Sequence, residues 1–138
     1  METLTITRQA EADIVAHARD LVPLECCGLL LGSGGRVAVS FRARNAAASP
    51  TRFLVDPSDH FTALRQARGL GLEVIGAYHS HPGSPPQPSP RDRRDADGLA
   101  EGFVSLIVSL RRAESPELAA FAWQDGNFRP LTLVRTQV

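Results

Sequence analysis

Apolar residues near the start of the chain recur three or four positions apart, and charged residues fall mostly between them. This spacing is typical of a helix with one buried face, here formed by Ala10, Ile14, Ala18 and Leu21. Thr7 suits the capping position of a helix start, and Pro23 stops the helix. We therefore expect a helix between these two residues that packs on the core.

Strand-like patterns cover much of the rest. The run 23–33 is too apolar for an edge strand, and the alternating segment 36–46 is expected to pair with it as a hairpin. Short apolar runs predict further strands at 53–55, 74–81 and 103–110. A terminal hairpin is expected from 118–124 and 128–134, with its turn at Asp125–Gly126.

A second helix is expected after residue 55. Asp56 and Pro57 have the residue types that start a helix, and Phe61, Leu64 and Ala67 give it an apolar stripe that we expect to be buried. A third, short helix is expected to start near residue 90 and to continue to Ala100. Together these elements predict an α/β (α+β) fold, with a mixed, curved β-sheet and helices packed against it. A chain of 138 residues predicts a single domain over 1–138.

The strand at 74–81 ends in two histidines. Because side chains of a strand alternate between its faces, His79 and His81 point the same way, with Ser80 on the other side. Pro82 then ends the strand. The two imidazoles converge on one point, which is a geometry that binds metal ions.

A proline-rich loop connects the histidines to the third helix. Five prolines in the nine residues 82–90 make this loop stiff. Ser89 is a good N-cap, Pro90 suits the first helical position, and Asp92 follows in the first turn. Its carboxylate is aimed back at the histidines. Two imidazoles and one carboxylate, with a fourth position left to water, form the ligand set of a catalytic zinc site.

The remaining polar residues of interest have simpler interpretations. His17 lies beside the stripe of the first helix and is expected at its surface or boundary, and His60 is expected to be exposed. Cys26 and Cys27 are adjacent, so they cannot build a disulfide framework and are expected as small core residues in a reducing cytoplasm. Glu25, an acid at the mouth of a buried strand, is costly unless it is solvated, paired or functional.

Charge and targeting signals exclude other classes. Formal net charge is zero and all 15 basic residues are arginine, so no basic tail or long patch indicates nucleic acid or an anionic membrane. No signal peptide opens the chain, and no apolar stretch approaches the roughly 20 residues that span a bilayer. We expect a cytoplasmic protein.

The histidine pair and the segment that follows it resemble the motif of the JAMM (MPN-plus) zinc metallopeptidases, in their minimal prokaryotic form. Their motif is a histidine pair, a proline, a serine three residues before an aspartate, and a glutamate far upstream. The pattern is filled here by His79, His81, Pro82, Ser89 and Asp92. The resemblance implies the JAMM/MPN fold, related to that of cytidine deaminases.

The resemblance also implies roles for individual residues. His79, His81 and Asp92 would hold one catalytic Zn²⁺. The segment from Pro23 to Glu25, followed by an apolar strand, resembles the family's catalytic glutamate segment, so Glu25 would be the general base. Ser89 would donate a hydrogen bond to the oxyanion, besides capping its helix.

The activity implied is hydrolysis of peptide or isopeptide bonds. It would occur after the C-terminal Gly-Gly of a small ubiquitin-like or sulfur-carrier protein, because the loops at 45–52 and 82–90 are too short to hold a larger partner. Whether the released group is a protein or a single amino acid stays open, as does a homodimer.

Three alternatives stand beside this hypothesis. A metal-free MPN-type scaffold usually lacks the ligands that this chain has. A RadC-like DNA-associated protein shares much of the motif, and salt-dependent DNA binding would favour it. A zinc deaminase is disfavoured because the chain has no histidine-x-glutamate or cysteine-x-x-cysteine pair.

Overall fold

The computed structural model describes residues 1–137, and within them seven strands form a closed barrel accompanied by three helices. The strands are β1 (Thr3–Thr7), β2 (Cys27–Ser33), β3 (Arg36–Ala43), β4 (Glu73–His81), β5 (Val104–Ser109), β6 (Glu117–Gln124) and β7 (Asn127–Thr136). The helices are α1 (Arg8–Leu21), α2 (Pro57–Gly69) and α3 (Pro90–Asp95). The predicted mixed sheet with packed helices is confirmed.

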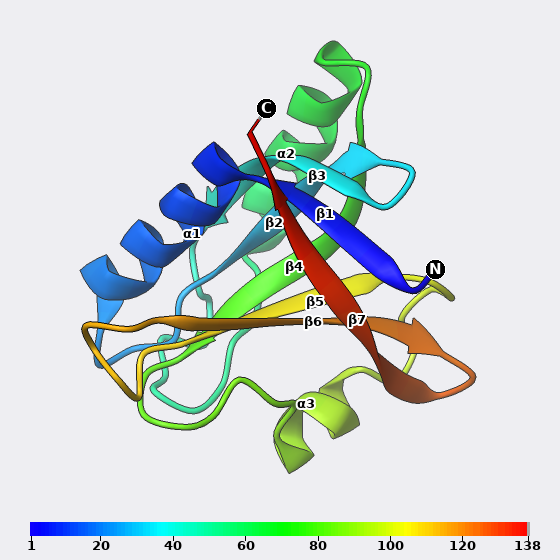
Figure 1. Cartoon of the computed structure of the whole chain (residues 1–138). Helices are drawn as coiled ribbons and strands as arrows, with labels where there is room; N and C mark the ends of the chain where they lie inside the picture. Colours follow the sequence, from blue (N-terminus) through cyan, green and yellow to red (C-terminus); the bar gives the residue numbers. More distant parts are fainter. Residues whose placement is uncertain (138) are drawn as a thin grey trace.

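The sheet closes on itself in the order β1, β3, β2, β4, β5, β6, β7. Parallel pairing of β1 with β7 completes the ring, so that the two ends of the chain form neighbouring strands (Figure 1). The expected hairpins of β2 with β3 and of β6 with β7 are present. Among the described residues, no helix combines the length and the apolar character needed to cross a membrane.

Helix α1 forms as its sequence pattern predicts. The Thr7 side chain accepts a hydrogen bond from the backbone N–H of Ala10 at 3.1 Å, which caps the helix start. Ala10, Ile14 and Ala18 are buried in the main core cluster. The expectation for His17 was wrong: it is 4% exposed, because the helix turns this side chain toward Tyr78 of the barrel.

Helix α2 starts at the predicted place, with Asp56 as its N-cap, but its buried face differs from the expected one. Ala67 is buried as expected, but Phe61 and Leu64 are 62% and 48% exposed, and Ala63 is buried in their place. Residues four apart share one helix face, and two alanines let the helix lie close to the sheet. They pack with Leu29 and other side chains in a second core cluster, on the other face of the strands.

Two smaller expectations were also wrong. Residues 53–55 do not form a strand. Val55 makes only an isolated antiparallel bridge with Asn45, because no strand pairs with this short segment. The helix expected to continue to residue 100 ends at Asp95. Gly98, with φ of +94°, lies beyond it in the left-handed region, where helical conformation is not possible.

Strand β4 contributes to both core clusters and carries the two histidines. It pairs antiparallel with β2 and parallel with β5. Tyr78 on one face is fully buried in the main core, while Ala77 on the other face packs in the second cluster under α2. Because side chains alternate, His79 and His81 share the face of Ala77 at the carboxyl end of the strand.

Candidate active site

The structure brings His79, His81 and Asp92 together. The two histidine Nε2 atoms are 3.2 Å apart, and Asp92 Oδ2 lies 3.2 Å from His79 Nε2 and 3.1 Å from His81 Nε2. All three side chains are buried. We call these residues the His–His–Asp triad.

A capping box at the start of α3 fixes the aspartate of the triad. The Ser89 hydroxyl accepts from the backbone N–H of Asp92 at 3.0 Å, and the Ser89 N–H donates to Asp92 Oδ2 at 2.9 Å. The predicted cap is therefore confirmed. In this cap the hydroxyl is an acceptor, so its own proton is not required there and can be donated to another group.

Neighbouring groups orient the two imidazoles. His81 Nδ1 lies 2.8 Å from the carbonyl oxygen of Pro85, an arrangement that sets the ring orientation and leaves Nε2 toward the triad. The ring of Phe53 stacks on that of His79, with centroids 4.2 Å apart and planes 15° from parallel. Neither contact has a signal in the sequence, because both come from loops whose course only the fold determines.

Glu25 lies in the segment between α1 and β2. Its side chain is only 4% exposed, and Oε1 has no hydrogen-bond partner among the described residues. Ser80 ties this segment to β4: its hydroxyl accepts from the Cys26 N–H at 2.8 Å, and its N–H donates to the Cys26 carbonyl at 3.1 Å. The next residue, Cys27, is in register with His79, so Glu25 is held beside the end of β4.

The acidic groups of the site have strongly shifted pKa values. Burial raises the pKa of Glu25 to about 7, against a smaller lowering by His81. For Asp92, burial alone would raise the pKa, but hydrogen bonds from His79 and His81 outweigh it and hold the pKa well below its usual range. The site thus combines a permanently ionised carboxylate with a carboxyl group that changes protonation near neutral pH.

The triad fits a metal ion. Ligand atoms about 2.0–2.1 Å from a tetrahedral zinc ion lie about 3.3 Å from one another, and the triad atoms are 3.1 to 3.2 Å apart. The donor set of two imidazole nitrogens and one carboxylate oxygen suits zinc and leaves one coordination position open. The unpartnered Glu25 oxygen lies in the same part of the molecule, as expected for a group that interacts with something besides protein atoms.

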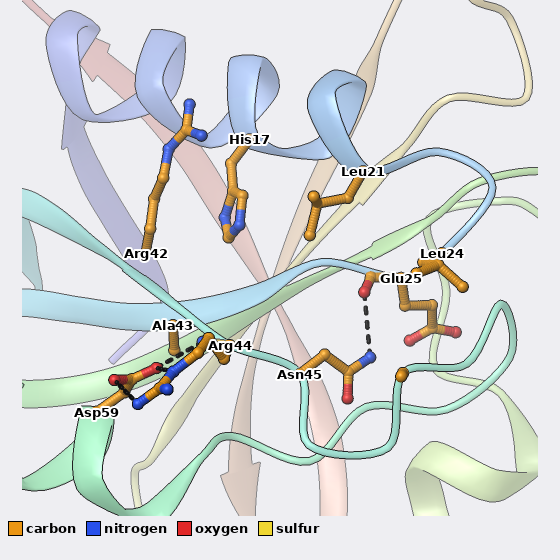
Figure 2. Close-up of a pocket in the computed structure, with 10 residues that line it drawn as sticks. His17, Leu21, Leu24, Glu25, Arg42, Ala43, Arg44, Asn45 and Asp59 are labelled. Carbon is orange, nitrogen blue, oxygen red and sulfur yellow. Dashed lines mark hydrogen bonds and ion pairs between the residues drawn. The ribbon is translucent and has the colours of Figure 1, made fainter.

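Two cavities flank the site. One, of about 450 Å³, is lined by His79 and Asp92 together with apolar side chains that include Phe53, Leu99 and Phe128. The exposed His60 lines this cavity and is not part of the triad. The other cavity, of about 630 Å³, lies between the end of α1 and the loop after β3, and is lined by Glu25, His17 and Arg42 among others (Figure 2).

A mixed β-barrel with a buried His–His–Asp triad at the end of one strand, and a buried glutamate beside it, has the architecture of a JAMM-type hydrolase. Comparison with known families agrees. The family described as prokaryotic homologs of the JAB domain matches residues 7–124, and the chain belongs to this family. The resemblance predicted from the sequence is confirmed, and JAB membership implies a metal site.

Curated relatives extend over much of the chain. A desampylase of Haloferax volcanii is 32% identical over 137 residues, covering 94% of each chain. A CysO-cysteine peptidase of Mycobacterium tuberculosis is 31% identical, over 82% of this chain and 77% of the relative. A probable TtuB-protein conjugate cleaving protease of Thermus thermophilus is 38% identical, over 59% of this chain and 55% of the relative. These relatives are peptidases by name, in agreement with the predicted enzyme class.

Solved structures share the fold. The solution structure of a protein from Desulfitobacterium hafniense is 29% identical and superposes with a TM-score of 0.87, covering 99% of this chain and 94% of that one. A JAB1/MPN domain protein from Archaeoglobus fulgidus is 20% identical with a TM-score of 0.61, over 96% of this chain and 98% of that one. The predicted JAMM/MPN fold is confirmed.

Proposed function

We propose that this protein is a zinc-dependent peptidase that cleaves peptide or isopeptide bonds after the C-terminal Gly-Gly of a small ubiquitin-like or sulfur-carrier protein. Among its relatives, one is named for CysO-cysteine and another for TtuB-protein conjugates, which supports a carrier protein as the acyl side of the bond. Residues 1–138 would form one catalytic domain. The buried, unpaired Cys26 and Cys27 fit a reducing cytoplasm.

The observation that carries the proposal is the buried triad with an unpartnered Glu25 oxygen beside it. His79, His81 and Asp92 would hold Zn²⁺. When bound, zinc supplies Lewis-acid chemistry, polarising a carbonyl and making water a good nucleophile near neutral pH. Asp92 is suited to this task because its pKa is low and Ser89 fixes its orientation.

Glu25 is the proposed general base. With a pKa of about 7 its carboxyl group can accept a proton from the attacking water and return it to the departing amine. Ser89 is the proposed donor to the oxyanion that forms as water attacks the carbonyl, because its cap uses the hydroxyl as an acceptor and leaves the proton available.

The cavity beside His79 and Asp92 is the proposed site of the carrier tail. Strands β2, β4 and β5, at and beside the triad, are each paired on both sides, so the tail has no free sheet edge to extend there. The extended segment 52–55, which lines the cavity and makes one bridge to Asn45, is the available backbone partner. Glycine would be required next to the scissile bond, since a tail in the cavity that Phe53, His79 and Asp92 line has little room for side chains beside the triad.

The test is a comparison of two carrier substrates. One ends in Gly-Gly followed by an added residue, and in the other both glycines are changed to alanine. We expect mass spectrometry to show loss of the added residue from the first substrate only. Equal cleavage of both, or faster cleavage of unfolded casein, would show a general peptidase.

A further inference from the structure

The side chain of Asn45, the second residue after β3, uses its full hydrogen-bonding capacity. Its Nδ2 donates to the carbonyl oxygens of Glu25 at 3.1 Å and Arg52 at 3.0 Å. Its Oδ1 accepts from the backbone N–H groups of Ala47 and Leu54, both at 2.9 Å. An amide has two donor hydrogens and two acceptor lone pairs, so all four are engaged. Figure 2 shows the bond to Glu25.

The bond to Glu25 matters because no strand ladder holds this residue. Glu25 lies in the irregular segment before β2, where its N–H donates to the carbonyl of Ser49 at 2.9 Å and its carbonyl accepts from Asn45. Both bonds connect Glu25 to the loop that Asn45 begins. The side-chain oxygen Oε1 has no partner among residues 1–137. The position of the carboxylate therefore depends on how its backbone is held.

The same amide fixes the other side of the site. Arg52 and Leu54, which it bonds through their carbonyl and N–H, flank Phe53 in the chain. The ring of Phe53 stacks on His79 of the triad. One side chain thus connects the backbone of the proposed base to the residue that covers a proposed metal ligand.

We propose that Asn45 is a positioning residue for hydrolysis: its two amide N–H donors hold Glu25 and the Phe53 segment in fixed relation across the site. This inference rests on the proposed function, in which Glu25 is the base. Asn45 itself touches neither the triad nor the substrate, and it acts through Glu25. The acceptor half of its amide shapes the loop, whereas the donor half places the base.

The replacement Asn45→Asp separates the two halves. It keeps an oxygen for the Ala47 and Leu54 N–H groups but faces the carbonyls of Glu25 and Arg52 with a second oxygen in place of the donor. We expect kcat on the Gly-Gly carrier to fall about 10- to 100-fold, with KM and bound zinc close to wild type. Wild-type kcat in this variant would overturn the inference.

A matched control is Asn127→Asp. Asn127 begins β7, its side chain donates to the Asp125 carbonyl at 3.4 Å in an exposed turn, and it has no contact with the site. This variant should keep wild-type kcat. A similar loss in both variants would mean that any added charge has this effect, and would overturn a special role for Asn45.

The double variant Glu25→Gln/Asn45→Asp tests whether Asn45 acts through Glu25. Because the base is already lost, its kcat should stay within about threefold of Glu25→Gln alone. Multiplied losses, as partial unfolding would give, would contradict the inference. If the Asp variant does not fold, Asn45→Ala, which adds no charge, takes its place in the cycle. An inactive wild type would instead contradict the proposed function, so the two failures are distinguishable.

Discussion

The two faces of strand β4 carry buried histidine sites of opposite character. On the core face, the Tyr78 hydroxyl and His17 Nδ1 lie 2.7 Å apart and are each other's hydrogen-bond partner, although His17 also borders a cavity. A Cβ at position 28 would overlap the Tyr78 ring, so Gly28 is required for this packing. On the other face, His79 and His81 direct Nε2 atoms and Asp92 directs an oxygen to one point, beside the cavity that His79 and Asp92 line. Burial of a histidine is thus compatible with either a structural or a metal-binding role.

The two sites differ in whether protein groups alone satisfy their buried polar atoms. The His17–Tyr78 pair satisfies one donor with one acceptor and lies in the apolar core. The triad gathers three ligand atoms at 3.1 to 3.2 Å from one another, and the Glu25 oxygen nearby lacks a partner among the described residues. A metal-binding function is inferred for the second face because three ligand atoms converge there beside a buried polar atom that no protein group satisfies.

The largest expected difference between the faces is in metal binding. Asp92→Ala removes the charged ligand and the capping-box carboxylate, so we expect zinc content to fall well below one per chain. Since metal chemistry supplies several kcal/mol of transition-state stabilisation, activity should fall by at least about 1,000-fold. Elemental analysis and turnover of the Gly-Gly carrier measure both. His17→Gln, on the core face, should retain zinc; zinc loss in this variant too would remove the distinction between the faces.

A smaller effect is expected for the proposed base. Glu25→Gln keeps the size of the side chain but cannot accept a proton, so turnover should fall by roughly 100-fold or more while zinc stays bound. Elemental analysis beside steady-state kinetics separates the two properties. Loss of zinc together with activity would make Glu25 a ligand instead of a base.

The smallest expected effect concerns stability and pH. Burial, with a further contribution from Arg42, lowers the pKa of His17 from 6.5 to about 4. Between these values the unfolded chain binds a proton that the folded protein excludes, so stability falls as pH falls. Each pKa unit corresponds to about 1.4 kcal/mol, so the contribution lost between pH 7 and 5 is roughly 2 kcal/mol.

This contribution is measured by urea unfolding of the wild type and His17→Gln at both pH values. Glutamine does not titrate, so the variant should lose less stability by that amount, while titration of the triad affects both proteins alike. Equal losses would show that the folded protein does not exclude the proton from His17.

The sequence predicted those parts of the site that depend on local rules. Strand alternation places His79 and His81 together, and the residue types at 89 to 92 specify a capped helix start. Other features depend on contacts between distant segments. Closure of the barrel pairs Thr3 with Thr132, and contact with Tyr78 buries His17. No local sequence pattern indicates either contact.

The error at α2 has a comparable cause. Phe61 and Leu64 fit the apolar period as well as Ala63 and Ala67 do, and only the close approach of the helix to the sheet selects the alanines. The sequence indicates only that Asn45 begins a loop, because the four groups to which its side chain is hydrogen-bonded come from three separate parts of the chain.

Helix α3 is six residues long, far below the roughly 12 residues that an isolated helix needs for even marginal stability. It depends on its capping box, and the carboxylate of that box is also the proposed zinc ligand. Metal occupancy is therefore coupled to local order in this segment. Arg91, Arg93 and Arg94 are exposed along it, and each is a cleavage point for trypsin once the helix opens. A molecule that lacks metal is therefore expected to be cut by trypsin in this helix sooner than one with zinc bound.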